Sequence, residues 1–304
     1  MVSIRRNVLI FHLGALGDFV MTWPLAMAAG RLFAQSRVMV VSHAQKGALA
    51  EKVLRVESVD IEQGWHQLFN ADLQLPERCE KLLAGAHSVF SFIASADEPW
   101  SQNLKRLAPN AELICLRTKA PDDAPPMHVT EYIASQLGSQ PAIQAAVTQM
   151  LRSIRERGVS GTRSSDGPIV IHPGSGAARK CWPVEGFVEL ATSLKREGRT
   201  VKFVVGETEL EQWPADRVEQ LRRVGEILQP PSYLDLLNAI HSAGTFIGND
   251  TGPTHLAAIT GVKTVALFGS DPTRWAPIGP QVTIVQAESI DAITVDQVQR
   301  AVSG

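Results

Sequence analysis

Polar residues crowd the stretch GNDTGPTHLAAITG, residues 248–261, where a strand-like run passes into a helix-like run. Pro253 suits the first turn of a helix, and the unpaired backbone N–H groups of such a terminus can bind an anion. The stretch therefore predicts a helix cap, a phosphate-binding turn, or both. Its candidate ligand-binding residues are Asp250, Thr251, Gly252 and His255.

The two ionisable residues of this stretch have different expected roles. The carboxylate of Asp250 would repel phosphate, so we expect it to orient the turn or to accept hydrogen bonds from sugar hydroxyls. His255 lies one turn into the helix and can add a hydrogen-bond donor. A single histidine is more often structural than catalytic, but the polar surroundings favour a functional role here.

A second turn, IHPGSGAARKCWP, follows another strand-like run and contains the flexible Pro-Gly-Ser-Gly segment. Ser175 and Gly176 belong to the loop, and Lys180 stands just before the next helix. A glycine-serine loop with a cation resembles an anion site in outline. The spacing is not that of a Walker loop. The alternative is a mobile loop whose cations, Arg179 and Lys180, are simply solvated.

Two further turns carry carboxylates. In HLGALGD, Gly14 and Gly17 permit a tight turn after a strand, and Asp18 stands near the start of a helix expected to run to about residue 33. Asp18 is either a helix N-cap or a general base. In VVGETELE, Glu207 and Glu209 either complement the helix dipole or bind ribose hydroxyls.

These turns must be positioned by strands that alternate with helices. Short apolar runs occur at residues 7–12, 37–41, 88–93 and 111–116, and again at 168–173, 200–206, 226–229, 244–248, 263–269 and 281–286. Runs that are apolar on both faces predict parallel sheets covered by helices on both sides. The Gly/Ser-rich stretch 158–168 is typical of a linker. We therefore expect an α/β protein with two doubly wound parallel-sheet domains, residues 1–160 and 161–304.

Composition excludes several classes of protein. A formal net charge of −2 over 304 residues gives no reason to expect nucleic acid as a partner. The three cysteines are widely spaced, which favours a reducing cytoplasm over a disulfide framework or a thiolate metal site. The basic start with Arg5 and Arg6 is better explained by a buried first strand than by a signal peptide. No apolar run approaches the ~18 residues of a membrane-spanning helix. There is also no Asp-x-Asp stretch to hold a divalent ion on a diphosphate.

Three segments resemble glycosyltransferase family 9, the ADP-heptose:lipopolysaccharide heptosyltransferases: HLGALGDFV, HPGSGAARKCWP and FIGNDTGPTHLAAITGVKTVALFGSDP. They occur in the expected order along nearly the whole chain. The resemblance implies a GT-B fold, with two Rossmann-like domains that face a cleft. It implies an acceptor-binding domain at 1–160 and a nucleotide-sugar-binding domain at 161–304. The implied reaction is an inverting, metal-independent glycosyl transfer without a cofactor, of heptose from ADP-heptose onto a lipopolysaccharide core or related saccharide.

The resemblance also assigns roles to residues. Asp18 matches the carboxylate proposed as general base, and Lys180 matches the lysine that contacts the donor phosphates. Glu207 is the best match for the ribose-binding carboxylate, with Glu209 as its competitor. The other matched positions on the donor side are Ser175, Gly176, Asp250, Thr251, Gly252 and His255, and those of the acceptor-side loop are His12, Gly14 and Gly17.

One departure concerns His12, where many members of the family carry Arg or Lys. If that cation binds an acidic acceptor, the acceptor of this protein differs. Two alternatives to the transferase are a UDP-sugar epimerase-like GT-B enzyme and a non-catalytic nucleotide-binding module. A glycolipid acceptor would bring a cytoplasmic protein to the inner membrane, as a peripheral contact at most. The side chains that could make this membrane contact are Trp65, Phe69, Trp100, Lys105 and Arg106. Such residues are more commonly scattered over a surface without any binding role.

Overall fold

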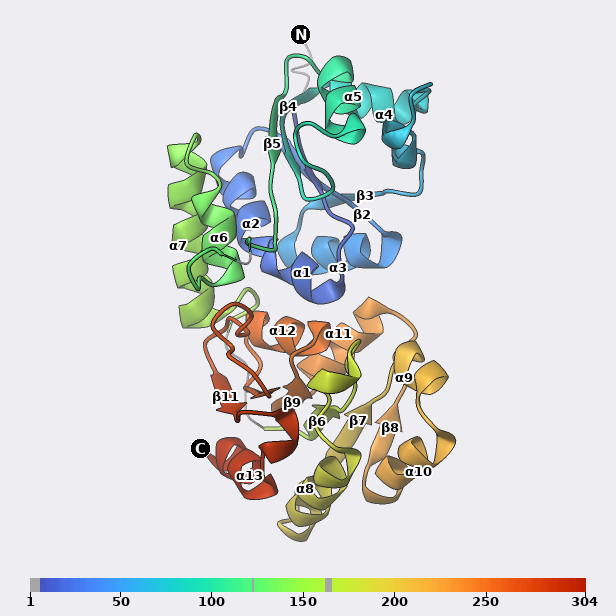
Figure 1. The fold of residues 1–304 in the computed structure, drawn as a ribbon, viewed down its shortest axis with the longest axis vertical. Coiled ribbons are helices and arrows are strands. Elements are labelled where there is room, and N and C mark those ends of the chain that lie inside the picture. Colours follow the sequence, from blue (N-terminus) through green and yellow to red (C-terminus); the bar gives the residue numbers. More distant parts are fainter. Residues whose placement is uncertain (1–5, 122, 162–165) are drawn as a thin grey trace. The chain divides into compact units, whose positions relative to one another are not determined.

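The computed structural model describes residues 6–121, 123–161 and 166–304. The chain divides into two compact units, Met1–Arg152 and Ser153–Gly304, each built on one parallel sheet (Figure 1). The division falls within a long helix, a few residues before the expected boundary at 160/161. Of the expected linker, residues 162–165 lie outside the described residues, as does Arg5 of the basic start.

The first unit contains a five-stranded sheet with the order β3-β2-β1-β4-β5, and all neighbouring pairs are parallel. Its strands are β1 (Asn7–Phe11), β2 (Arg37–Ser42), β3 (Glu57–Asp60), β4 (Ala86–Ser91) and β5 (Glu112–Cys115). The helices are α1 (Leu16–Met21), α2 (Trp23–Leu32), α3 (Ala44–Leu54), η1 (Trp65–Phe69), α4 (Glu77–Ala84), α5 (Pro99–Leu107), α6 (Val129–Ser135) and α7 (Pro141–Arg157), the last of which continues into the second unit.

The second unit contains a six-stranded parallel sheet with the order β11-β10-β9-β6-β7-β8. Its strands are β6 (Ile169–His172), β7 (Val201–Val204), β8 (Glu226–Leu228), β9 (Thr245–Asn249), β10 (Thr264–Phe268) and β11 (Val282–Gln286). The helices are η2 (Ala178–Lys180), α8 (Val184–Arg196), α9 (Glu207–Gln212), α10 (Ala215–Val224), α11 (Tyr233–His241), α12 (Gly252–Ile259), η3 (Ile290–Ala292) and α13 (Val295–Ser303).

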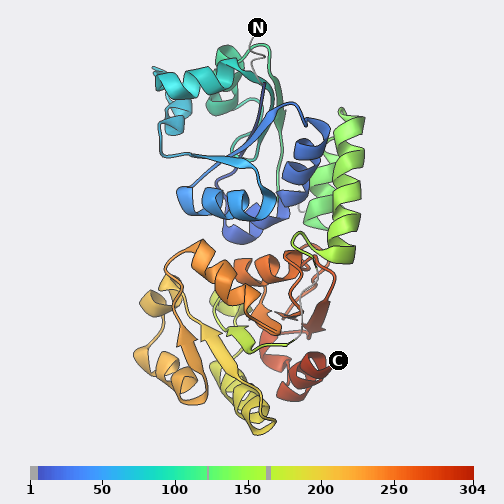
Figure 2. The ribbon, with the colours of Figure 1, turned by 180° about the vertical axis from the view of Figure 1, so that it is seen from behind.

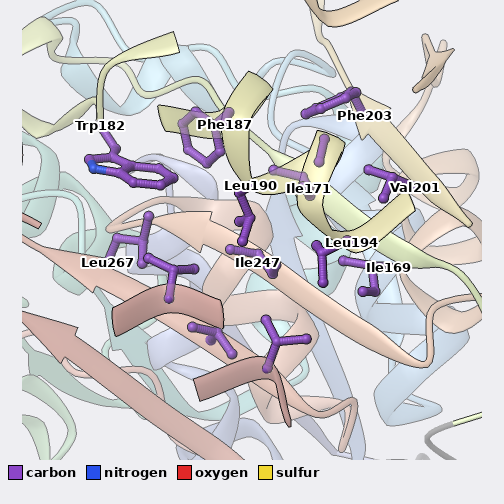
Figure 3. Packing of buried hydrophobic residues seen from close by; sticks show 14 of the residues in the cluster. Ile169, Ile171, Trp182, Phe187, Leu190, Leu194, Val201, Phe203, Ile247 and Leu267 are labelled. Atoms are coloured by element: carbon purple, nitrogen blue, oxygen red, sulfur yellow. The ribbon is translucent and has the colours of Figure 1, made fainter. Parts of the chain in front are cut away.

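Helices cover both faces of the second sheet. Helices α8, α10 and α13 pack together on one face, and α11 and α12 pack on the other (Figures 1 and 2). The core under α8 includes Trp182 and Phe187, whose rings meet edge to face with centroids 4.9 Å apart (Figure 3). The prediction of two doubly wound parallel α/β domains is therefore confirmed.

Aromatic packing in the first unit corrects one expectation. Trp65 and Trp100 are fully buried, and each places its ring edge to face against Phe11 with centroids 5.0 Å apart. The idea that these tryptophans could touch a membrane is therefore wrong, since burying such large apolar rings stabilises the core instead. Phe69, in contrast, is 50% exposed.

Two local predictions were also wrong. The helix expected to run from Asp18 to about residue 33 is interrupted at Thr22, so α1 and α2 are separate helices. Pro24 lacks a backbone N–H and favours a new helix start at this point. Strand β3 was missed because its sequence, ESVD, is short and mostly polar, as an edge strand can be. Within the described residues, no helix is both long and apolar enough to span a bilayer.

Candidate nucleotide-binding and catalytic sites

The second unit gathers its polar turns where the strand order reverses. Strand β6 pairs with β9 on one side and with β7 on the other, and the register sets His172 opposite Gly248. The loops that follow these strands therefore leave the same edge of the sheet. In doubly wound folds, ligands bind at this edge, next to the reversal of strand order.

Asp250 is the centre of an ionic cluster at this edge. Its Oδ2 lies 2.5 Å from the Nζ of Lys180, which ends η2, and its Oδ1 lies 3.2 Å from the Nε2 of His255. Burial would raise the pKa of Asp250, but His255 and then Lys180 outweigh it and hold that pKa below its ordinary value. Asp250 is therefore an anion with two basic neighbours, and the structure brings together the three residues that the sequence singled out.

Helix α12 begins beside this cluster. Thr251 is its N-cap residue but makes no side-chain hydrogen bond to the helix backbone, and Gly252 and Pro253 open the first turn. The hydroxyl of Thr254 instead donates to the carbonyl of Asn249 at 2.7 Å and lies 3.1 Å from the hydroxyl of Thr251. The first-turn N–H groups are thus left to bind another acceptor, which makes this terminus chemically suited to an anion.

Asn249 holds the two loops together and was missed by the sequence analysis. Its fully buried side chain accepts from the backbone N–H of Trp182 at 3.0 Å. It also donates to the carbonyls of Pro173 and Gly174 at 2.9 and 3.1 Å. One amide therefore fixes both ends of the loop that carries Lys180. The sequence feature that could have identified Asn249 is its position directly before Asp250.

His172 is a second residue that the sequence analysis missed. It ends β6, and its Nδ1 lies 3.3 Å from the hydroxyl of Thr251, while its Nε2 lies 3.8 Å from a carboxylate oxygen of Glu209. Burial lowers the pKa of His172, against the opposing charge of Glu209. The ring therefore lies between the turn after β7 and the turn after β9.

The acidic turn separates its two candidate carboxylates. Glu209 is buried, and its Oε2 accepts from the backbone N–H of Gly206 at 2.9 Å, capping α9. Its other oxygen lies against Gly174, where an added Cβ would collide with it. Glu207 is the first residue of α9 and is exposed.

The loop after β6 is partly open. Ser175 is half-buried, and its hydroxyl accepts from the backbone N–H of Ala177 at 3.4 Å. Gly176 is exposed, with space around the position where a Cβ would stand. These two residues lie in the same loop as Lys180, as the sequence predicted.

The first unit places Asp18 in the first turn of α1, where Ala15 is the N-cap residue. The N-cap alternative for Asp18 is therefore wrong. Asp18 is half-buried, as is Gly17. A Cβ added to Gly14 would lie 2.9 Å from the ring of His12 and 3.3 Å from the Cβ of Asp18, so this turn packs closely and needs glycine at position 14.

His12 lies beneath this turn as an uncharged ring. It is 1% exposed, lies between the rings of Phe19 and Phe92, and its pKa falls to about 3 because of burial and the nearby charge of Lys46. Lys46, from the first turn of α3, was not singled out in the sequence. It donates to the carbonyls of Gly14 and Leu13 at 2.6 and 3.3 Å. The cation at this turn is therefore Lys46 and not the residue at position 12.

Among the described residues, no group of three or more His, Cys, Asp or Glu side chains is arranged to hold a metal ion. The ionic contacts of the second-unit cluster join a carboxylate to a lysine and a histidine instead.

Comparisons with known proteins agree with this architecture. Residues 118–301 match the family model described as glycosyltransferase family 9 (heptosyltransferase). Lipopolysaccharide heptosyltransferase 1 of Campylobacter coli is 30% identical over 110 residues, which are 34% of this chain and 32% of that protein. The chain thus aligns with about a third of the length of this curated relative.

Solved structures share the fold over almost the whole chain. The structure of E. coli ADP-heptose lps heptosyltransferase II has a TM-score of 0.68 and 18% identity, and the match covers 98% of this chain and 97% of that one. The structure of E. coli heptosyltransferase WaaC with ADP has a TM-score of 0.65 and 18% identity, with 98% and 99% covered. Since the family model spans more than half of its residues, the chain belongs to glycosyltransferase family 9.

Proposed function

We propose that the protein transfers heptose from an ADP-sugar, ADP-heptose, to a saccharide or glycolipid acceptor of the lipopolysaccharide core. The observation that carries the proposal is the cluster of Lys180, Asp250 and His255 beside the N-terminus of α12. Support comes from membership of the family and from a structural neighbour described with ADP. Transfer proceeds with inversion and needs neither a metal ion nor a cofactor.

On the donor side, Lys180 and the first-turn N–H groups of α12 bind the diphosphate. They stabilise the negative charge that it gains as it leaves the sugar. Ser175 and Gly176 shape the loop around it. The exposed Glu207 binds the ribose hydroxyls in preference to Glu209, because the carboxylate of Glu209 already caps α9.

On the acceptor side, Asp18 acts as general base. An acceptor hydroxyl attacks the anomeric carbon from the face opposite the diphosphate. The new C–O bond forms as the bond to the diphosphate oxygen breaks, Asp18 takes the hydroxyl proton, and ADP leaves with the bonding electrons. General-base catalysis of this kind contributes about 10²–10⁴ in rate.

The acceptor determines where the protein works. A glycolipid acceptor brings a cytoplasmic enzyme to the inner membrane as a peripheral protein. Flotation with vesicles that contain lipid A–core acceptors tests this contact. Binding that requires the acceptor supports it, and absence of the protein from the vesicle fraction contradicts it.

The first experiment is calorimetric titration of the purified protein with ADP, UDP, GDP and NAD, without added metal. We expect a preference for ADP that is lost in Lys180→Ala and kept in Arg179→Ala, since Arg179 is an exposed neighbour of the same charge. Preference for UDP would favour an epimerase-like enzyme, and binding of none of the four would contradict the donor site.

A transfer assay with ADP-heptose and lipid A–core acceptors tests the base. We expect Asp18→Asn to lower kcat by about 10²–10⁴ while the affinity for ADP stays unchanged. Activity of this variant within tenfold of the wild type would exclude Asp18 as the base. No transfer by the wild type, despite ADP binding, would favour a non-catalytic nucleotide-binding module.

A further inference from the structure

Lys46 is buried at a turn that the proposed reaction uses. It lies in the first turn of α3, directly after β2, and is only 6% exposed. Lysine is almost never buried to this extent unless its ammonium group is paired. Here the ammonium donates to the carbonyl of Gly14 at 2.6 Å and to that of Leu13 at 3.3 Å. Two of its three donors are thus committed to the backbone between β1 and α1.

Gly14 connects this ammonium to Asp18. Its carbonyl is held by Lys46, and the space where its side chain would stand is closed by Asp18 and His12. A shift of the Gly14 backbone would therefore move the residues against which the carboxylate of Asp18 packs. The hydrogen bond from Lys46 on α3 to the Gly14 carbonyl therefore fixes the path of the chain immediately before α1, the helix that carries Asp18.

The charges at this turn also couple Lys46 to Asp18. Burial lowers the pKa of Lys46, and the carboxylate of Asp18 acts in the opposite direction. Such an interaction is mutual, so the ammonium favours the ionised form of Asp18. His12, the other titratable group at this turn, is neutral because of its burial and the charge of Lys46. Of these three groups, Lys46 is thus the one that supplies positive charge.

We propose that Lys46 is a positioning residue for sugar transfer, which fixes the turn between β1 and α1 and supplies positive charge near Asp18. The proposal rests on the function proposed above, in which Asp18 is the base. Lys46 does not bind an acidic acceptor, because it is buried and bonded to two backbone carbonyls. An acceptor anion would have to displace these bonds.

Steady-state kinetics over a range of pH test the proposal with three variants. Lys46→Met removes the charge and keeps an unbranched side chain that is one atom shorter, Lys46→Arg keeps the charge, and Lys52→Met is a control at an exposed position of α3. For Lys46→Met we expect kcat to fall about tenfold or more at neutral pH, with an unchanged KM for the ADP-sugar. The acid limb of the kcat/KM profile should move to higher pH.

Lys46→Arg should restore the position of the acid limb, and Lys52→Met should match the wild type. An acid limb of Lys46→Met that coincides with that of the wild type would overturn the proposal. So would a fall in kcat that is the same at every pH, because a purely structural role would produce it.

A measurement that needs no activity separates this proposal from the proposed function. In Asp18→Asn, NMR titration of the Lys46 ammonium should give a midpoint at lower pH than in the wild type, because the carboxylate that stabilises the charge is gone. Asp18 is half-buried, so this substitution leaves the core intact. An unchanged midpoint would exclude the coupling even if sugar transfer is observed. A lowered midpoint in a protein without transferase activity would keep the coupling and reject the function.

Discussion

Lys180 Nζ lies 2.5 Å from Asp250 Oδ2, although the two residues are 70 positions apart in the sequence. The contact exists because β6 and β9 are neighbours in the sheet, so that the loops after them meet. His255 binds the second oxygen of the same carboxylate from within α12. The lysine expected to hold the donor is therefore held by an anion of the protein itself.

The lowered pKa of Asp250 predicts a specific loss of stability in acid. The folded state keeps Asp250 ionised at a pH where the unfolded chain, with a pKa near 3.8, takes up a proton. The contribution of Asp250 is thus complete above 3.8 and is lost as the pH falls towards its lower folded-state pKa. Urea unfolding should show a smaller acid-induced loss for Asp250→Asn than for the wild type. Asp291→Asn, at an exposed position, should follow the wild type, and equal acid sensitivity of all three proteins would refute the prediction.

Removing the amide of Asn249 should release the loop that carries Lys180. Asn249→Ala leaves the N–H of Trp182 and the carbonyls of Pro173 and Gly174 without their buried partner. We expect a loss of about 2 kcal/mol or more in the free energy of unfolding, together with weaker binding of ADP. Urea unfolding and calorimetry measure the two effects. Asn238→Ala, on the exposed side of α11, is the matched control, and similar behaviour of the two variants would exclude the role of Asn249.

Two glycines of one loop should differ in their tolerance of a methyl group. Gly174→Ala forces the carboxylate of Glu209 away from the capped N-terminus of α9, whereas Gly176→Ala meets open space. We expect Gly174→Ala to lose about 1–3 kcal/mol of stability. Gly176→Ala should remain close to the wild type. Thermal unfolding compares the two variants directly. Equal melting temperatures would show that the Glu209 side chain can move aside without a loss of stability.

His12 should make the first unit sensitive to moderate acid. Its folded-state pKa of about 3 lies below the unfolded value of 6.5. Between these two pH values the unfolded chain binds a proton at His12 and the folded protein does not. The destabilisation begins as the pH falls below 6.5 and grows by about 1.4 kcal/mol per pH unit until the folded-state pKa is reached. His12→Gln should make this slope smaller, as measured by urea unfolding across the range, and burial of His172 accounts for part of what remains. His66→Gln, at an exposed position, should keep the full slope, and a slope in His12→Gln equal to that of the wild type would contradict the assignment.

Much of the fold could be predicted because strand-forming runs are local signals. The start of α12 and the strands of both sheets, apart from β3, follow from apolar runs and from Gly, Pro and polar residues at their ends, and the predicted family membership is confirmed. The same reasoning located Lys180, Asp250 and His255, since polar residues at strand ends are visible in the sequence. Their roles in catalysis and binding, with those of Asp18 and Glu207, stay predictions.

What the sequence could not provide are contacts between distant segments. Asn249 and His172 are the last residues of β9 and β6, and their roles arise from neighbours that only the sheet order brings near. Lys46 belongs to an ordinary helix start, and nothing in the residues around it indicates that it reaches the turn after β1. The burial of Trp65 and Trp100 likewise depends on the position of Phe11 in the central strand.

The bond between Asp250 and Lys180 makes nucleotide capture an exchange of ions. A diphosphate that binds Lys180, whose side chain is 40% exposed, competes with a carboxylate already in place, so the lysine passes from one anion to another. The gain in affinity is then the difference between two ion pairs and not the full strength of one. Bulk salt competes with both pairs, so binding should depend only weakly on ionic strength.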